Sequence, residues 1–598
     1  MTRTFLVAAA LTCSFLTPVI AQQAADAIEP EAASALSAFG ALSDAARAAL
    51  AAKEAGQPTT AENWMVAAAN PLAVEAGAEV LRNGGTAADA MVAVQAVLGL
   101  VEPQSSGLGG GAFLVWYDAN SGEVTTLDGR ETAPLAVTPT LFQTDDGEPM
   151  GFWDAVIGGR SVGTPGTPML MEEAHAKWGR SDWAGLFSSA IALAEDGFPV
   201  SERMASSIEG GAERLQTFSR TADYFFPDGV ALQAGDILVN EDYANTLRLI
   251  AAHGSDAFYT GPIADDIVAT VRTAAGNPGM LSATDLAIYQ VIEREPVCVA
   301  YRTSEVCGMG PPSSGALTVG QILGMLDRYD LAAMGPEDAN AWRLIGDASR
   351  LAFADRGRYM ADSDFVPMPT DGLTADAYLD ERAALLGGET ALEDVEPGSP
   401  EWDHAILLAD DQSLELPSTS HISIVDQYGN ALSMTTTIEN GFGSRLMVRG
   451  FLLNNELTDF SFRTHSDGVP IANRIEPGKR PRSSMSPTIV LENGEPSLVI
   501  GSPGGSRIIG YVAQAIIAHL DWGMDVQQAV SMPHLVNRFG TYDLEDGTRA
   551  AEFENALTEL GFEVNVRGLN SGLHAIQVTS DGLSGGADPR REGIALGE

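Results

Sequence analysis

The chain is poor in the residues that bind metal ions. Its 598 residues include only three cysteines and eight histidines, and no Cys-x-x-Cys or His-x-x-x-His spacing occurs among them. Zinc sites usually draw their ligands from such closely spaced pairs. The sequence also lacks a P-loop, in which a lysine follows the glycine-rich turn. We therefore expect neither a metal ion nor an organic cofactor.

Basic residues are also few. The chain has 34 lysines and arginines against 80 aspartates and glutamates, which gives a formal net charge of −46. Such a charge argues against binding to nucleic acid or to an anionic membrane surface. The acidic residues are spread along the chain and do not gather in a tail, so we interpret the charge as a source of solubility.

Long apolar runs are missing except near the N-terminus. There Arg3 precedes an apolar stretch, Phe5–Leu16, and Val19-Ile-Ala21 is suited to cleavage. This pattern predicts a secretory signal over residues 1–21 and a periplasmic or secreted protein. No other stretch is long and apolar enough to cross a bilayer, so we expect no membrane anchor.

The next segment, residues 22–62, is rich in alanine and acidic residues. It is predicted to be a linker, or a peripheral helix where the composition favours one at Ala45–Lys53. Beyond it, hydrophobic periodicity predicts two helices followed by two strands. These four elements are Pro71–Asn83, Ala87–Leu100, Ala112–Tyr117 and Glu123–Asp128.

Two of the three cysteines lie close together in the sequence. Cys298 and Cys307 flank a stretch that is predicted to form two short strands around Arg302. Such a hairpin brings two Cα atoms within about 4.4–6.8 Å, the separation that a disulfide needs. Export makes oxidation favourable. We expect a disulfide, with two buried thiols as the alternative.

A hairpin is predicted around Thr419. The alternating run Thr419–Val425 leads into the turn Asp426-Gln-Tyr-Gly-Asn430, and a second β-rich run, Ala431–Thr437, follows. Gly429 suits the left-handed conformation that closes such a turn. Folding the hairpin about Tyr428 brings Thr419 opposite Thr437, to within about one residue. One threonine hydroxyl then has a neighbour that can orient it.

A threonine nucleophile needs a base, and no Gly-x-Ser-x-Gly elbow lies near Thr419. Cleavage of the chain between Ser418 and Thr419 would supply one, because the new α-amino group has a pKa of about 7.7–8.0. A threonine activated by its own amine is a known solution. By itself, Thr-Ser-His at the start of a strand is ordinary structure.

A long series of motifs surrounds this hairpin. They are Asn70-Pro-Leu-Ala73, Asn83-Gly-Gly-Thr-Ala-Ala-Asp-Ala90, Val101-Glu-Pro-Gln-Ser-Ser-Gly-Leu-Gly-Gly-Gly111, Asp128-Gly-Arg-Glu-Thr-Ala-Pro134, Pro311-Pro-Ser-Ser-Gly315, Thr419-Ser-His421, Phe442-Gly-Ser444, Leu453-Asn-Asn-Glu-Leu-Thr-Asp-Phe460, Lys479-Arg-Pro-Arg-Ser-Ser-Met-Ser-Pro487 and Gly501-Ser-Pro-Gly-Gly-Ser-Arg507. In these motifs, and in their order, the chain resembles the γ-glutamyltranspeptidase family of N-terminal-nucleophile hydrolases from about Met65 to the C-terminus.

The resemblance implies a four-layer αββα fold built by one precursor that cleaves itself. The cut falls between Ser418 and Thr419 and gives a large subunit, residues 63–418, and a small catalytic subunit, residues 419–598, which stay together as a heterodimer. It implies that Thr419 is the nucleophile and that Thr437 orients it. Ser420 is the competing nucleophile.

Gly504 and Gly505 lie between an apolar strand, Ser497–Ile500, and a helix expected to begin at Ser506. Glycines at a helix N-terminus allow backbone N–H groups to face a negative charge. A tight turn and a phosphate cradle are the alternatives. By resemblance, this pair is the oxyanion hole.

The resemblance also implies a set of substrate-binding residues. Arg130 would bind the substrate's α-carboxylate, a task suited to a planar bidentate donor, with hydroxyl donors from Ser483 and Ser484. Glu456 and Asp459 would receive the α-ammonium group. Without the resemblance, Arg130 would be interpreted as a surface arginine paired with Glu131, and the two acids as solvated loop charges.

Two features depart from the family's pattern. Glu439 stands where the family often has asparagine near the α-amino group. The segment between Asp459 and Ser483 is shorter than in well-known bacterial members and has no tyrosine in Ser461–Lys479 to act as a lid. A reduced lid resembles members that include acylases for bulkier amides.

The predicted function is a γ-glutamyl hydrolase and transferase that acts on glutathione and related amides. A γ-glutamyl ester of Thr419 would pass its acyl group to water, an amino acid or a peptide. The alternatives are an acylase for another N-acyl group, such as glutaryl, and an unprocessed secreted binding protein. His421 lies two residues from Thr419, roughly 6.6 Å along a strand, so we interpret it as a packing residue.

Overall fold

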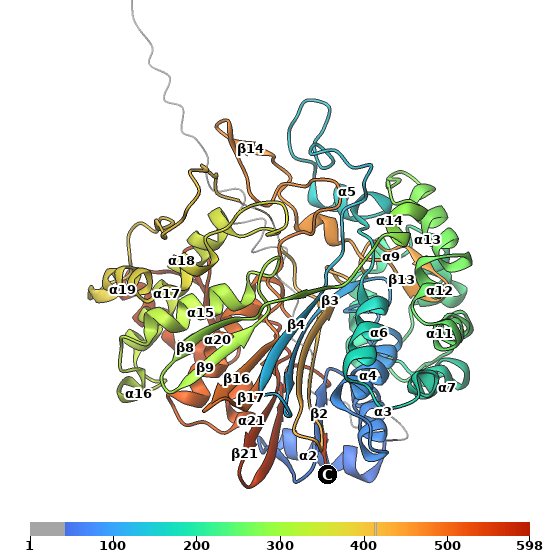
Figure 1. Ribbon diagram of the computed structural model, residues 1–598, viewed down its shortest axis with the longest axis horizontal. Coiled ribbons are helices and arrows are strands. Elements are labelled where there is room, and N and C mark those ends of the chain that lie inside the picture. The colour runs from blue at the N-terminus through green and yellow to red at the C-terminus, as the bar shows by residue number, and fades with distance from the viewer. Residues whose placement is uncertain (1–41, 412, 414) are drawn as a thin grey trace, which may run out of the picture.

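The computed structural model describes residues 42–598 except 412 and 414. Two seven-stranded antiparallel sheets face each other at its centre (Figure 1). The first sheet has the spatial order β1 (Thr59–Ala61), β22 (Gly582–Ala587), β21 (His574–Thr579), β17 (Glu495–Gly501), β16 (Thr488–Glu492), β9 (Ser304–Gly308), β8 (Val297–Tyr301). The second has the order β23 (Ile594–Gly597), β2 (Met65–Ala68), β10 (Ser420–Val425), β11 (Ala431–Thr437), β3 (Gly111–Asp118), β4 (Glu123–Gly129), β7 (Ile292–Arg294).

Side-chain alternation along the strands fills the space between the sheets. In β2, Met65 and Ala67 join the core between the two sheets, whereas Val66 and Ala68 face the helices. Both faces of the strand are therefore buried. This is why strands such as β2 and β10 are apolar along most of their length, as a sheet covered on both sides requires.

Helices cover the outer face of each sheet (Figure 1). The second sheet is covered by α3 (Pro71–Arg82), α4 (Ala87–Val101) and α6 (Thr167–Trp178). The first is covered by α15 (Gly315–Leu326), α20 (Ile508–Leu520) and α21 (Val526–Ser531), and α17 (Ala339–Tyr359) packs on α15. The four-layer αββα architecture is confirmed, and each sheet combines strands from before and after Thr419.

The four predicted elements near the start of the chain form as expected, with ends that agree or differ by one residue. The prediction of a linker over residues 22–62 is wrong for its second half. Helix α2 (Asp44–Glu54) buries Ala46, Ala49 and Leu50, and β1 pairs with β22. Apolar contacts and strand pairing hold this segment on the body, which agrees with the alternative of a peripheral helix. The predicted signal, residues 1–21, and the rest of the linker up to residue 41 lie outside the described residues.

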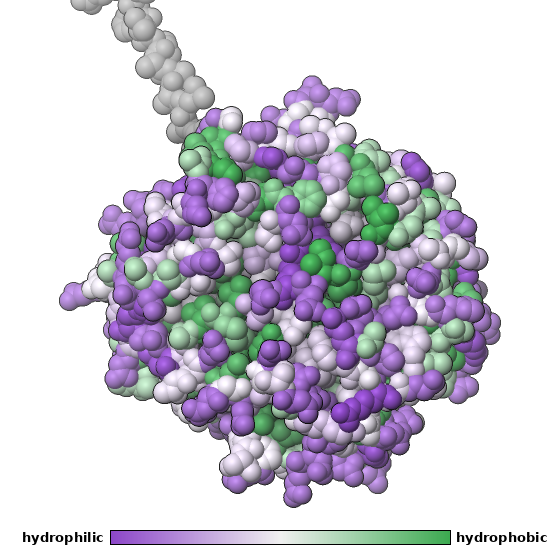
Figure 2. All heavy atoms as spheres, in the orientation of Figure 1, coloured by the Kyte–Doolittle hydropathy of each residue, from purple (hydrophilic) through white to green (hydrophobic). Residues whose placement is uncertain are grey.

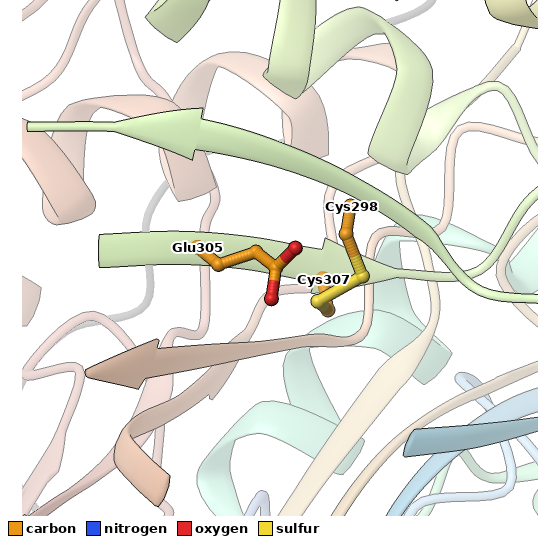
Figure 3. A group of neighbouring side chains, drawn as sticks. All are labelled: Cys298, Glu305 and Cys307. Atoms are coloured by element: carbon orange, nitrogen blue, oxygen red, sulfur yellow. A yellow bond between two sulfur atoms is a disulfide. The ribbon is translucent and has the colours of Figure 1, made fainter. Parts of the chain in front are cut away.

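Cys298 and Cys307 form the predicted disulfide (Figure 3). They are direct partners in the β8–β9 pair, with their Cα atoms 4.1 Å apart. Glu305 lies beside them on β9. Both sulfurs are used in the disulfide, so this group of three offers one carboxylate and no thiolate.

Hydrophilic residues cover most of the visible face, and apolar residues form small separate patches between them (Figure 2). Among residues 42–598, apart from 412 and 414, no helix is long and apolar enough to span a bilayer.

Candidate active site

The β10–β11 hairpin brings Thr419 and Thr437 together, as predicted. Ser420 pairs with Thr436, so the preceding residue, Thr419, lies opposite Thr437. The Thr419 Oγ1 hydroxyl donates to Thr437 Oγ1 at 3.1 Å, and both side chains are buried. The backbone N–H of Glu439 also donates to Thr437 Oγ1, at 2.9 Å, which fixes this hydroxyl. Thr437 therefore sets the direction of the Thr419 hydroxyl.

The turn between β17 and α20 presents a backbone donor to the bond that is predicted to break. The Gly504 N–H donates to the carbonyl oxygen of Ser418 at 3.2 Å. Gly504 has φ +135°, and a Cβ there would lie 2.7 Å from the ring of Tyr511, so only glycine fits. Gly505 follows at φ +60°, in the 3-10 turn η6 (Gly505–Arg507) that opens α20. The Ser418 carbonyl is thus polarised by a donor of the kind that stabilises an oxyanion.

The backbone at Thr419 is strained. Its φ is +94°, a value that a β-branched residue rarely adopts. Such outliers cost about 1–3 kcal/mol and concentrate at functional sites. The strain is located at the residue immediately after the Ser418 carbonyl, where the predicted cut would release it.

One pocket collects the predicted substrate-binding residues. From the predicted set it is lined by Arg130, Thr419, Thr437, Glu439, Glu456, Asp459, Ser483, Ser484 and Gly505. These residues come from the end of β4, the β10–β11 hairpin, the 3-10 turn η5 (Glu456–Asp459), the segment before β16 and the turn η6. Residues 461–479 do not line it; among them, β14 (His465–Ser466) and β15 (Val469–Pro470) form an exposed hairpin away from the sheets (Figure 1).

Arg130 is almost completely buried and is neutralised inside the pocket. Its guanidinium forms ion pairs with Glu456 and Asp459, and it donates to the carbonyl oxygens of Pro481 and Arg482 at 3.2 and 3.0 Å. Burial alone would lower its pKa, but the two carboxylates outweigh burial and raise the pKa. The interpretation of Arg130 as a surface arginine is therefore wrong, and the two predicted ammonium-binding acids contact it directly.

The pocket holds more acid than base. Burial raises the pKa of Glu439 well above its ordinary value, and the nearby carboxyl groups of Asp459 and Glu456 raise it further. Burial likewise raises the pKa of Asp459, although Arg130 opposes this. Its Oδ1 atom accepts no hydrogen bond from the described part of the chain. Arg130 is paired with two of these carboxyl groups, and Glu439 lies close to both of them but accepts its hydrogen bonds from uncharged groups, so the pocket favours an additional cation.

Two residues that the sequence did not single out occupy the pocket. Glu415 accepts a hydrogen bond from the Ser484 hydroxyl and forms an ion pair with Arg356 of α17. Burial would raise the pKa of Glu415, but Arg356 and Arg482 outweigh it and lower the pKa to about 2. The backbone N–H of Leu416 donates to Glu439 Oε1 at 3.4 Å. The only signal in the sequence was that these residues lie three and four positions before Thr419.

His421 has the packing role that its spacing indicated. It is fully buried, with Nδ1 2.9 Å from Thr435 Oγ1 and Nε2 3.0 Å from Ser423 Oγ. Burial, together with the neighbouring His574, lowers its pKa well below the ordinary value. Both ring nitrogens are engaged by other hydroxyls, so His421 is not placed to act as a base for Thr419.

Comparisons with known proteins agree with this geometry. The family model for gamma-glutamyltranspeptidase matches residues 73–598. The glutathione hydrolase proenzyme of Bacillus subtilis strain 168 is 37% identical over 556 residues, which cover 90% of this chain and 92% of that protein. The acylase ACY 1 proenzyme of Pseudomonas sp. strain SE83 is 34% identical over 550 residues, covering 90% of this chain and 94% of its own.

Among solved structures, the cephalosporin acylase from Bacillus halodurans aligns with a TM-score of 0.80 at 27% identity, covering 91% of this chain and 97% of that one. The matched residues include every strand of both sheets except β1 and β2, together with the Thr419 hairpin and the glycine turn. On these grounds, the chain belongs to the gamma-glutamyltranspeptidase family.

Proposed function

We propose that this protein is a self-cleaving γ-glutamyl hydrolase and transferase with Thr419 as its nucleophile. Two contacts and one strained residue of the uncut chain support the first step. Thr437 orients the Thr419 hydroxyl, Gly504 donates to the Ser418 carbonyl, and the strained Thr419 backbone is relieved by cleavage. The products are a large subunit that ends at Ser418 and keeps α2 and β1, and a small subunit, residues 419–598. They remain paired because both sheets contain strands of each.

Cleavage requires only residues of this chain and water. The Thr419 hydroxyl attacks the Ser418 carbonyl carbon, the peptide C–N bond breaks, and the hydroxyl proton passes to the released nitrogen. Water then hydrolyses the ester, which leaves a carboxylate on Ser418 and a free hydroxyl and α-amine on Thr419. This amine, with a pKa of about 7.7–8.0, becomes the general base for turnover.

Turnover repeats the same chemistry on a γ-glutamyl amide. The Thr419 hydroxyl attacks the γ-carbonyl, its proton passes through the α-amine to the leaving nitrogen, and a γ-glutamyl ester forms. The Gly504 and Gly505 N–H groups stabilise the oxyanion. Water then gives glutamate, or the amine of an amino acid or peptide gives a new γ-glutamyl amide.

The observation that carries the substrate assignment is the way the chain fills its own pocket. The Glu415 carboxylate rests on the Ser484 hydroxyl, and the adjacent Leu416 N–H points at the Glu439 carboxyl group. The Glu415 carboxylate thus occupies a group predicted to bind the donor's α-carboxylate. The Leu416 N–H occupies a group predicted to lie near the donor's α-ammonium. A free donor presents the same two groups once this segment has moved away.

The charges of the pocket favour a donor that keeps its α-ammonium. Glu456 and Asp459 are paired with Arg130, and Glu439 lies close to both acids. Burial raises the pKa of all three carboxyl groups, and repulsion from neighbouring carboxyl groups adds to it. An ammonium group relieves this repulsion in a way that a neutral methylene group does not. Arg130, Ser483 and Ser484 would then bind the donor's α-carboxylate.

An acylase for glutaryl or related amides is the second candidate, because a solved relative and a curated relative are named acylases and residues 461–479 do not line the pocket. The decisive assay compares γ-glutamyl-p-nitroanilide with glutaryl-p-nitroanilide, which differ only in the α-amino group. Our proposal requires a much higher kcat/KM for the γ-glutamyl compound. Equal or reversed preference would favour the acylase, and an intact, inactive chain would favour a binding protein.

We also propose that the protein works outside the cytoplasm. The predicted signal over residues 1–21 and the Cys298–Cys307 disulfide both support an oxidising compartment such as the periplasm.

A further inference from the structure

A buried arginine from the C-terminal segment holds the backbone of Thr419. Arg591 Nη1 donates to the Thr419 carbonyl oxygen at 3.0 Å, and Nε donates to Asn570 Oδ1 at 3.2 Å. The arginine is 2% exposed and Thr419 is 4% exposed. The contact is therefore a desolvated, charge-assisted hydrogen bond, one of the stronger kinds in proteins.

The same arginine packs against the turn that supplies the Gly504 donor. A Cβ added at Gly572 would lie 2.7 Å from Arg591 Cδ and 2.7 Å from Pro503 Cγ. Pro503 directly precedes Gly504, and Gly572 has no side chain at the point where the two elements meet. Arg591 thus donates to the nucleophile's carbonyl and lies beside Gly572, which also adjoins the residue before Gly504.

A lysine from helix α2 fixes the backbone of Arg591. Lys53 Nζ donates to the carbonyl oxygens of Arg591 and Gly593, at 2.6 and 2.7 Å. Burial lowers the pKa of Lys53 to about 8, although Asp588 and Glu592 oppose this. Helix α2 precedes residues 73–598, which match the family model, and it packs on β23. A charged group from the N-terminal segment is thus tied to the residue that holds Thr419.

We propose that Arg591 is a positioning residue for Thr419 in both self-cleavage and turnover, and that Lys53 keeps Arg591 in place. The inference rests on the proposed role of Thr419 as nucleophile. Thr419 is held at a φ of +94°, which costs energy unless neighbouring contacts stabilise it. Anchoring its carbonyl fixes the direction of the hydroxyl, and a misplacement of about 1 Å costs reactions on the order of 10²-fold.

The first test compares Lys53→Met with Lys53→Arg. Lys53→Met keeps the length of the side chain but removes both hydrogen bonds, whereas Lys53→Arg keeps donors for the two carbonyls. The matched control is Lys177→Met, which removes an exposed lysine that is ion-paired with Glu293 and Glu173 on the surface. Each chain is synthesised in a cell-free system, and the small fragment is followed over time by mass spectrometry.

We expect Lys53→Met to slow both self-cleavage and kcat by at least about tenfold, with KM unchanged within about twofold. The hydrogen bonds of Lys53 and Arg591 go to backbone carbonyls and to Asn570, and not to the charged side chains proposed to bind the donor. Lys53→Arg should recover most of both rates, and Lys177→Met should match the unmodified chain. A general loss of stability would not lower kcat while leaving KM unchanged, and Lys53→Arg would not restore the rates.

The second test changes Arg591 in two ways, first by moving its side chain with the charge kept and then by removing the charge. Gly572→Ala introduces a methyl group against Arg591 Cδ and should lower kcat, while Arg591→Met should lower kcat further, on the order of 10²-fold. Near-ultraviolet circular dichroism and the melting temperature identify chains that fail to fold. Wild-type rates of cleavage and turnover in folded Arg591→Met and Lys53→Met proteins would overturn the inference. Cleavage of a Thr419→Ala chain would instead overturn the proposed function on which the inference rests.

Discussion

The pocket has two halves that are built from different chemistry. The reaction half consists of Thr419, Thr437 and the Gly504 N–H, which are neutral hydroxyl and backbone groups placed by strand pairing and a glycine turn. The recognition half consists of buried charged side chains, with Arg130 set among carboxylates. Strand register fixes the first half, and long-range ion pairs from several loops fix the second.

The two halves also differ in their state before cleavage. In the uncut chain the hydroxyl pair and the backbone donor of the reaction half are already in place, whereas the proposed base, the α-amine of Thr419, forms only on cleavage. The recognition half is filled by Glu415 and Leu416, which engage Ser484 and Glu439. Self-cleavage therefore needs no substrate, whereas turnover needs this segment to move away. Each of the following predictions separates the two halves.

The largest effect is expected in the reaction half. Thr419→Ala removes the attacking oxygen, so the chain should stay intact and show no turnover above background. Thr419→Ser and Ser420→Ala should both still cleave, because each retains a hydroxyl at residue 419. Denaturing gels and a γ-glutamyl-p-nitroanilide assay measure both properties, and a cleaved Thr419→Ala chain would contradict the assignment.

A large effect confined to the recognition half is expected for Arg130→Ala. The substitution removes the proposed partner of the donor's α-carboxylate and leaves Glu456 and Asp459 without their cation. Losing such a contact costs about 2–5 kcal/mol, so KM for γ-glutamyl donors should rise strongly while self-cleavage continues.

Arg130→Lys serves as the control for charge, because it keeps the cation but loses the planar bidentate donor. We expect its KM to lie between those of the unmodified and Arg130→Ala proteins. A near-normal KM in Arg130→Ala would mean that the α-carboxylate binds elsewhere, or that the substrate has none.

A moderate, pH-dependent effect is expected at Glu439. Burial and the neighbouring acids raise the pKa of Glu439, so this carboxyl group keeps its proton to higher pH than an ordinary glutamate, and a bound ammonium favours its loss. Binding then releases a proton, and donor affinity should increase as pH rises through this raised pKa. KM measured from about pH 6 to about pH 9 should fall in the unmodified enzyme and change less in Glu439→Asn. Parallel profiles for the two proteins would argue against this role.

The smallest effect concerns the fate of the acyl ester. Because residues 461–479 do not line the pocket, the ester should be open to water, and hydrolysis should exceed transfer. Transfer prevails only where the site excludes water and positions the acceptor, which is worth about 7–11 kcal/mol at best. The measurement is the ratio of glutamate to γ-glutamyl-glycylglycine with glutathione as donor. A strong excess of the transfer product would show that the missing lid does not control acceptor choice.

The sequence predicted the reaction half well because its information is local. Alternating residues and Gly429 fix the hairpin register, and the register alone brings Thr419 to Thr437. The spacing of apolar residues along the chain likewise predicted helices α3 and α4. The resemblance supplied the four layers and the residues of the recognition half, whose members lie far apart in the chain.

What the sequence did not reveal are contacts between distant segments that carry no pattern. Nothing in the spacing of Arg130, Glu456 and Asp459 shows that they pair with one another. Glu415 and Arg591 each hold an ordinary place in a loop, and only the folded chain brings them to Ser484 and to Thr419. The sequence left the segment before β2 open between a linker and a peripheral helix. A short helix and a short edge strand give only a weak periodic pattern of apolar residues.

The central claim is that Thr419 becomes the N-terminal residue of a small subunit by self-cleavage. The most direct test is to purify the full-length protein with protease inhibitors present and determine the mass and N-terminal residue of every fragment. The account predicts two fragments, with the smaller one beginning at Thr419. A single chain that persists after prolonged incubation, or a small fragment that begins at any other residue, would contradict it.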